Sequence, residues 1–136
     1  MEYQSPLHKK LHDGVFVFTA ETTPPDASDK EALLKKINPL KDIADAINVT
    51  DSPGAKVHMS ALTAAIILAQ YDIDPILQLT VRDRNRLAIQ GDLVGASALG
   101  VHIFFVYPEM ILKLVTNQKQ NLPKILIVQH WLEQQI

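Results

Sequence analysis

Polar residues that could do chemistry stand where apolar, strand-like segments end. Glu21 follows the β-branched and aromatic segment 15–20 and precedes Pro24-Pro25. A carboxyl group at the mouth of a sheet can be partly buried, which favours the protonated form that a general acid needs. The other interpretation of Glu21 is a solvated loop carboxylate, and a single acid does not separate the two.

The next two apolar segments also end in polar residues. These residues are Asn48, Thr50, Asp51, Gln78, Thr80, Arg82 and Asp83. Their side chains could bind a ligand through hydrogen bonds and charge. Asn, Thr and Asp are also common in ordinary turns. The residue types alone therefore do not decide between a ligand-binding site and turn residues.

The basic run 82–86 could hold a phosphate group or begin a solvated helix. Asp83 is interleaved with the arginines, and no aromatic residue beside them offers a stacking platform for bases. The charge pattern favours a solvated helix start, with Arg84 and Arg86 facing solvent. Only Arg82, nearer the end of the preceding apolar segment, keeps a role at a site.

Composition indicates one soluble globular domain. The 136 residues are 47% hydrophobic and 21% charged, with a formal net charge of −2, so no global field attracts nucleic acid or an acidic membrane. The chain has no cysteine, which excludes thiolate chemistry and fits a reducing compartment. The N-terminus lacks the apolar region of a signal peptide, which predicts a cytoplasmic protein. The histidines have no metal-ligand spacing, and no phosphate-binding glycine motif occurs.

Strand-like and helical segments alternate along the first hundred residues. We expect strands at 15–20, 46–49, 75–80 and 101–106, and helices at 28–37, 58–71 and 84–99. Ser28 with Glu31 predicts a capping box, Asp83 an N-cap and Gly100 a C-terminal cap. Leu87 and Val94 belong to a narrow stripe suited to packing on a sheet.

The alternation predicts an α/β fold with a parallel sheet. A doubly wound sheet and a (β/α)8 barrel both remain open on spacing alone. Either architecture places chemistry at the carboxyl ends of the strands, where Glu21 and the polar residues after the next two strands lie.

The sequence divides into three parts. Residues 1–13 are expected to be a leader, 14–106 a partial barrel and 107–136 a tail of different composition. From residue 101 to the end there is no Gly, Ala, Asp, Ser or Arg, although these types are frequent before it.

Three collinear segments within residues 10–102 carry a family resemblance. They read "FTAETTPP", "INVTDSPGAKVHMSAL" and "PILQLTVRDRNRLAIQGDLVGASALGV", and they resemble methylenetetrahydrofolate reductase. The resemblance implies the first three to four βα units of a (β/α)8 TIM barrel. It also implies bound FAD, hydride from NADH or NADPH, and reduction of 5,10-methylenetetrahydrofolate to 5-methyltetrahydrofolate.

The resemblance assigns roles to the polar strand ends. Glu21 matches the acid that protonates the folate substrate. The folate is the expected small-molecule partner. Thr50, Asp51 and Pro53 match positions that contact flavin or nicotinamide. Gln78 stands where other branches have a flavin-contacting histidine, and an amide can still donate one hydrogen bond. Thr80 and Arg82 complete the expected cofactor-binding rim.

The fourth strand departs from the family, in which a Gly-Asp pair ends that strand. Here Phe105-Val106-Tyr107-Pro108 stands instead, which suggests a frameshift near codon 102 and an inactive remnant as the alternative function. Three or four βα units would leave a sheet edge open, so we expect the isolated chain to retain little FAD. A second copy or a barrel-completing partner could close the edge. A nucleic-acid or membrane partner is not expected.

Overall fold

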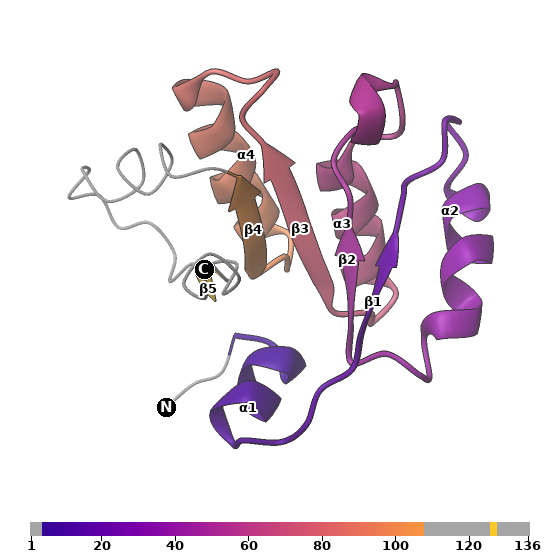
Figure 1. Cartoon of the computed structure of the whole chain (residues 1–136), viewed down its shortest axis with the longest axis vertical. Coiled ribbons are helices and arrows are strands. Elements are labelled where there is room, and N and C mark those ends of the chain that lie inside the picture. Colours follow the sequence, from indigo (N-terminus) through magenta and orange to yellow (C-terminus); the bar gives the residue numbers. More distant parts are fainter. Residues whose placement is uncertain (1–3, 108–125, 128–136) are drawn as a thin grey trace, which may run out of the picture.

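The described chain is a layered α/β structure (Figure 1). The computed structural model describes residues 4–107 and 126–127. In chain order its elements are α1 (Pro6–His12), β1 (Thr19–Thr22), α2 (Lys30–Ile37), the short 3-10 helix η1 (Asn38–Leu40), β2 (Ala46–Val49), the 3-10 turn η2 (Pro53–Ala55), α3 (Ala61–Gln70), β3 (Pro75–Thr80), α4 (Arg86–Ala98), β4 (Ile103–Tyr107) and β5 (Leu126–Ile127). Within these residues no helix is long and apolar enough to cross a membrane.

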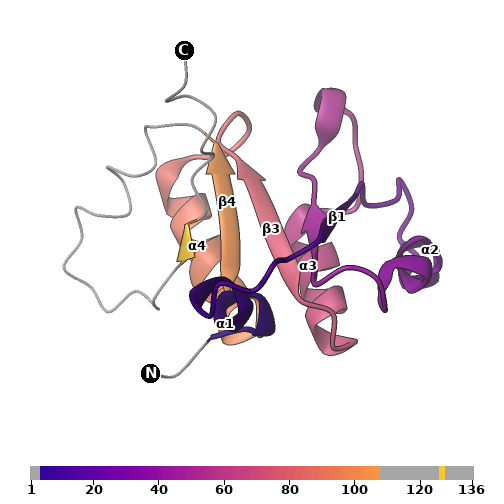
Figure 2. The same cartoon turned by 60° about the horizontal axis from the view of Figure 1, so that its bottom comes forward.

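The strands form one parallel sheet in the order β1-β2-β3-β4-β5. Helices α2, α3 and α4 contribute to a single buried cluster on one face, whereas α1 packs on the other face, as Figure 2 shows. A doubly wound sheet would reverse its strand order and carry long helices on both faces. Sequential order with α2–α4 on one face instead matches consecutive units of a (β/α)8 barrel, which confirms the predicted fold class.

Side-chain alternation along β3 explains the two faces. Leu77 and Leu79 are fully buried against the helices, while Ile76 packs against Leu7 of α1 on the opposite face. Gln78 and Thr80 share the face of Ile76, because every second residue of a strand points the same way. We call this second face the inner face, and α1 covers it near the amino ends of the strands. Burial of each large core side chain stabilises the fold by about 1.5–3 kcal/mol.

The strand predictions were accurate in the middle of the sheet and shifted at its edges. β2 and β3 have the predicted bounds, and β4 begins two residues later than expected. The first strand was predicted wrongly at residues 15–20. It runs from Thr19 to Thr22, and Phe16 and Phe18 before it are exposed. Pairing with β2 begins only at Thr19, opposite Ala46.

The helices are shorter at their starts than predicted, because other residues provide the caps. Asp29, not Ser28, caps α2, and its carboxylate accepts the Glu31 N–H at 2.9 Å. Ser60 caps α3, which therefore excludes residues 58–60. Asn85, not Asp83, caps α4 by accepting the Ala88 N–H at 2.9 Å. Gly100 follows the C-cap of α4 with φ +89°, as predicted.

The face of α4 that packs on the sheet is not the predicted one, because the helix is rotated about its axis relative to the prediction. Leu87 and Val94 are exposed, whereas Ile89, Leu93 and Ala96 pack in the helix-side core. Leu7, in the segment predicted as a leader, is buried against the inner face. Of the predicted tail 107–136, only Tyr107 and Leu126–Ile127 lie within the described residues.

Candidate functional site

Glu21 and Gln78 meet on the inner face near the carboxyl ends of the strands. The Gln78 amide Nε2 donates to Glu21 Oε2 at 3.4 Å, which joins β1 to β3 across β2. This length lies beyond the usual N–H···O range, so the bond is weak and a ligand can replace it. The partial burial expected for Glu21 is not observed, because the residue is exposed. Its carboxyl group is therefore open to a substrate.

Asn48 lies between these residues and braces the strand that carries Glu21. Asn48 is the cross-strand partner of Glu21. Its Nδ2 donates to the Ala20 carbonyl at 3.2 Å and to Thr19 Oγ1 at 3.4 Å. The amide thus ties β2 to β1 directly beneath the carboxylate.

The polar groups of Thr50 are engaged in hydrogen bonds within the chain. The residue is buried, and its hydroxyl lies 3.3 Å from the Thr22 carbonyl and 3.1 Å from Thr23 Oγ1. Its N–H also donates to the Thr22 carbonyl at 3.1 Å. Thr50 therefore holds the end of β2 against the end of β1, and Pro53, in the exposed turn η2 that follows, is left on the surface.

Asp51 is the centre of a partly buried ionic network. Its side chain is 4% exposed and accepts the Thr80 N–H at 2.8 Å. The Arg84 guanidinium donates to both Asp51 oxygens, at 2.5 and 3.3 Å, and also to the Thr80 carbonyl at 3.1 Å. Arg84 Nε forms an ion pair with Asp92 Oδ2 at 3.3 Å. This network joins the β2–α3 loop to the start of α4.

The solvent-facing position predicted for Arg84 is therefore wrong. Its side chain is only 18% exposed, and the attraction of Asp51 turns it inward. Burial opposes the charged guanidinium, but the hydrogen bonds and charges of Asp51 and Asp92 outweigh it and raise the pKa of Arg84 above its ordinary value. Asp92 and Arg84 had not been predicted as part of any site.

Arg82 remains at the rim with an exposed guanidinium. Its Nε donates to Asp83 Oδ2 at 2.8 Å and its Nη2 to the Ser52 carbonyl at 3.2 Å, while Thr80 Oγ1 accepts its backbone N–H at 3.2 Å. The hydrogen bond to Asp83 is the main cause that raises the pKa of Arg82 and lowers that of Asp83. An incoming anion would compete with Asp83 for this guanidinium.

The predicted site residues thus fall into two groups. Glu21, Gln78 and Arg82 present polar groups that a ligand can reach, whereas Thr50 and Asp51 are engaged within the chain. A carboxyl group can exchange a proton, an amide can orient a ligand and a guanidinium can bind an anion.

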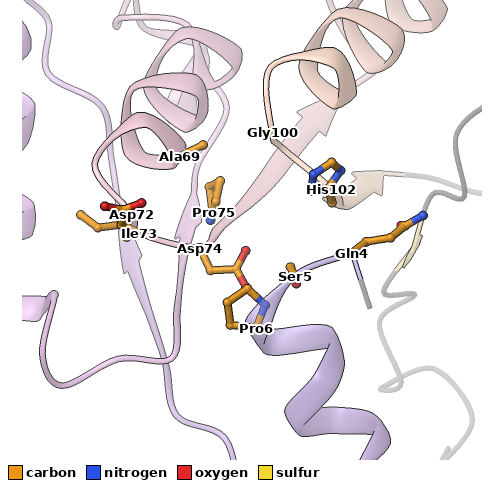
Figure 3. A pocket seen from close by; sticks show the side chains of 10 residues that line it. All are labelled: Gln4, Ser5, Pro6, Ala69, Asp72, Ile73, Asp74, Pro75, Gly100 and His102. Atoms are coloured by element: carbon orange, nitrogen blue, oxygen red, sulfur yellow. The ribbon is translucent and has the colours of Figure 1, made fainter. Parts of the chain in front are cut away.

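A hollow lies at the opposite, amino end of the strands (Figure 3). It has a volume of about 300 Å³ and is lined by residues from the starts of α1, β3 and β4, among them Ser5, Asp74 and His102. The Asp74 carboxylate accepts the Leu7 N–H at 2.9 Å and so ties α1 to the sheet. This hollow is remote from the polar strand ends.

Asp74→Asn is expected to stabilise the protein at neutral pH. Burial raises the pKa of Asp74 above 3.8, against the lowering effect of the Leu7 N–H and the Ser5 hydroxyl. Because the folded-state pKa of Asp74 is raised, the protonated carboxyl contributes its full stability below pH 3.8. That stability is lost as the pH rises through the folded-state pKa, where the carboxyl becomes charged in a partly buried place. Asparagine keeps an acceptor for Leu7 without the charge. Thermal unfolding across this pH range should show the unfolding temperature of the variant rising relative to that of the wild type as the pH rises. A variant with a lower unfolding temperature than the wild type at pH 7 would contradict this.

A parallel sheet of consecutive βα units is the arrangement of (β/α)8 barrels, whose enzymes do their chemistry at the carboxyl ends of the strands. The family model described as methylenetetrahydrofolate reductase matches residues 6–105 of the 136, which is more than half of the chain. The chain therefore belongs to the methylenetetrahydrofolate reductase family, a membership that suggests an oxidoreductase. No curated protein matches it.

Proposed function

We propose that this chain acts in the FAD-dependent reduction of 5,10-methylenetetrahydrofolate to 5-methyltetrahydrofolate by NADH or NADPH. The observation that carries the proposal is the meeting of Glu21 and Gln78 across β2 on the inner face. Family membership supports the reaction class, and all the polar strand ends lie within the matched residues 6–105.

The chain's own contribution to the reaction is a proton and its placement. Glu21 is the proton donor to the folate, whose five-membered ring opens on protonation. Gln78 holds the Glu21 carboxyl through its amide, and it can accept from the protonated acid if the amide turns its oxygen toward it. Asn48 fixes the strand beneath. A positioned acid of this kind contributes about 10²–10⁴-fold to a rate.

The flavin, when bound, supplies hydride transfer between the nicotinamide and the folate. On this chain its partners would be Gln78, Thr80 and the Arg82 guanidinium, with the loop of Pro53 beside them. Thr50 and Asp51 would shape that loop, because their polar groups bind the chain itself. So few free groups predict weak binding, with little FAD retained on purification.

The test is a reductase assay of the purified full chain with FAD supplied in excess. NADH or NADPH oxidation that depends on both 5,10-methylenetetrahydrofolate and the chain is the expected result. Free FAD without protein, and protein without folate, are the controls. A chain that shows no folate-dependent oxidation at saturating FAD would refute the proposal.

An inactive remnant is the alternative function. The composition changes after residue 101, and the family match ends at 105. Nucleotide sequencing across codon 102 tests this alternative, because a remnant of this kind requires a single-base disruption and a family-like reading frame downstream. An undisturbed gene would remove its basis. Cytoplasmic location belongs to the proposal, since a cysteine-free reductase fits a reducing compartment.

A further inference from the structure

The hollow at the amino ends of the strands contains an acid that the proposed reaction does not use. Asp74 directly precedes β3, and it lines the hollow together with Ser5 and His102 (Figure 3). The Asp74 carboxylate is partly buried, and its hydrogen-bond donors are two neutral groups, the Leu7 N–H at 2.9 Å and the Ser5 hydroxyl. None of the ion pairs among the described residues includes Asp74. In that part of the chain its negative charge therefore has no cation beside it.

A carboxylate in this position lowers the stability of the fold. Burial raises the pKa of Asp74, because neutral donors replace only part of the water that a charged carboxylate loses. Asparagine would still accept from the Leu7 N–H and would carry no charge. Natural sequences keep such unfavourable groups mainly at functional sites, where a ligand compensates for them. A positively charged ligand is the kind that would compensate for Asp74.

His102 does not supply the missing positive charge. The charge of His102 has the smallest of the effects on the pKa of Asp74, and the two residues form no ion pair. A neutral imidazole nitrogen accepts a hydrogen bond, so His102 offers a second acceptor to a ligand. The exposed Asp72 adds another carboxylate, and no Lys or Arg is among the described residues that line the hollow. The polar lining therefore favours a cation over an anion.

The rest of the lining and the volume define the size and character of the ligand. Ala69, Ile73 and Pro75 contribute apolar surface. The volume of about 300 Å³ is at the low end for small-molecule sites. At about 30 Å³ per atom, the share of a water molecule in the liquid, the hollow holds roughly ten non-hydrogen atoms.

We propose that this hollow binds a small organic cation, a primary ammonium group on a short apolar body. The ammonium group donates hydrogen bonds to the Asp74 carboxylate and to His102, and the body contacts the apolar part of the lining. The hollow is remote from Glu21 and the other polar strand ends. The inference therefore does not rest on the proposed reductase function.

Titration of the full chain with cyclohexylammonium chloride at neutral pH, followed by NMR of the backbone amides, tests the proposal. A molecule of this size is expected to bind with a dissociation constant on the order of 1 mM. The amides of Asp74, Gly100 and His102 should show saturable shifts. Cyclohexanol has the same ring without the charge, and cyclohexanecarboxylate has the opposite charge. Both should bind about tenfold more weakly or worse, because neither places an ammonium group against the carboxylate.

Asp74→Asn separates binding from stability. The variant is expected to bind cyclohexylammonium about tenfold more weakly, because it lacks the charged acceptor, while its unfolding temperature at neutral pH rises. Loss of binding in a more stable protein cannot result from unfolding. Asp26→Asn is the matched control, because Asp26 is an exposed acid in the loop that follows β1, at the carboxyl ends of the strands. This control should bind like the wild type.

The proposal fails on any of four results. The first is a wild type without saturable shifts around the hollow up to about 30 mM cyclohexylammonium, well above the expected constant. The second is cyclohexanol binding as tightly as the amine, and the third is Asp74→Asn binding as tightly as the wild type. The fourth is equal weakening in Asp26→Asn and Asp74→Asn, which would show attraction to the overall negative charge and not to one site.

Discussion

Replacing Glu21 with glutamine is expected to lower the folate-dependent turnover by about 10²–10⁴-fold, the usual contribution of a positioned acid. Glutamine has nearly the same shape and still reaches the Gln78 amide, but it cannot supply a proton. The binding of FAD should change little, because the exposed carboxyl is not proposed to hold it. Turnover is measured at saturating FAD, and binding by titration of flavin fluorescence.

Glu31→Gln is the matched control for this substitution. Glu31 is another exposed glutamate, in the first turn of α2 and away from the inner face. Its replacement should leave turnover as in the wild type. A Glu21→Gln variant that keeps more than about one tenth of the wild-type turnover would show that the acid is elsewhere, since even a modest general acid contributes more than that.

Replacing Asp51 with alanine is expected to lower the free energy of unfolding by about 3 kcal/mol, because the partly buried Arg84 charge loses its main partner. Asp51 is nearly inaccessible, and it accepts hydrogen bonds from both the Thr80 N–H and Arg84. Its loss would strand the Arg84 guanidinium with only Asp92 as a carboxylate partner. Urea unfolding followed by circular dichroism measures the change.

Asp83→Ala provides the comparison for Asp51. Asp83 also pairs with an arginine, but its side chain is 62% exposed, so its replacement should leave the unfolding midpoint nearly unchanged. In the double variant Asp51→Ala/Arg84→Met, part of the lost stability should return, because no charge is left buried without its partner. Equal midpoints for Asp51→Ala and Asp83→Ala would disprove the role given to the network.

The sequence predicted the centre of the sheet because its signals there are local. β2 and β3 are short apolar runs bounded by turn residues, and their bounds were correct. The first strand was misplaced because VFVFTA has strong β propensity whether or not a neighbour pairs with it. Only the position of β2 decides that pairing begins at Thr19.

The site was predictable where it depends on strand ends and not where it depends on loops. Carboxyl ends of parallel strands lie at one edge of a sheet, so the approach of Glu21 to Gln78 could be expected from strand assignments. The capture of Arg84 by Asp51 joins loops 33 residues apart in sequence. Nothing in the run 82–86 tells which arginine turns inward, since that depends on where the β2–α3 loop lies.

The central claim is that Glu21 and Gln78 lie close together on the inner face, at the carboxyl ends of the strands. Cross-linking of introduced cysteines tests this claim most directly. The chain has no cysteine of its own, so every thiol reports an introduced position. Strands two apart in a sheet are separated by roughly 10 Å, which a short dithiol-reactive reagent can span. The account predicts rapid cross-linking within Glu21→Cys/Gln78→Cys monomers and little within Ala20→Cys/Gln78→Cys, because Ala20 packs toward the helices. Equal rates for the two pairs, or no cross-link in the first, would contradict it.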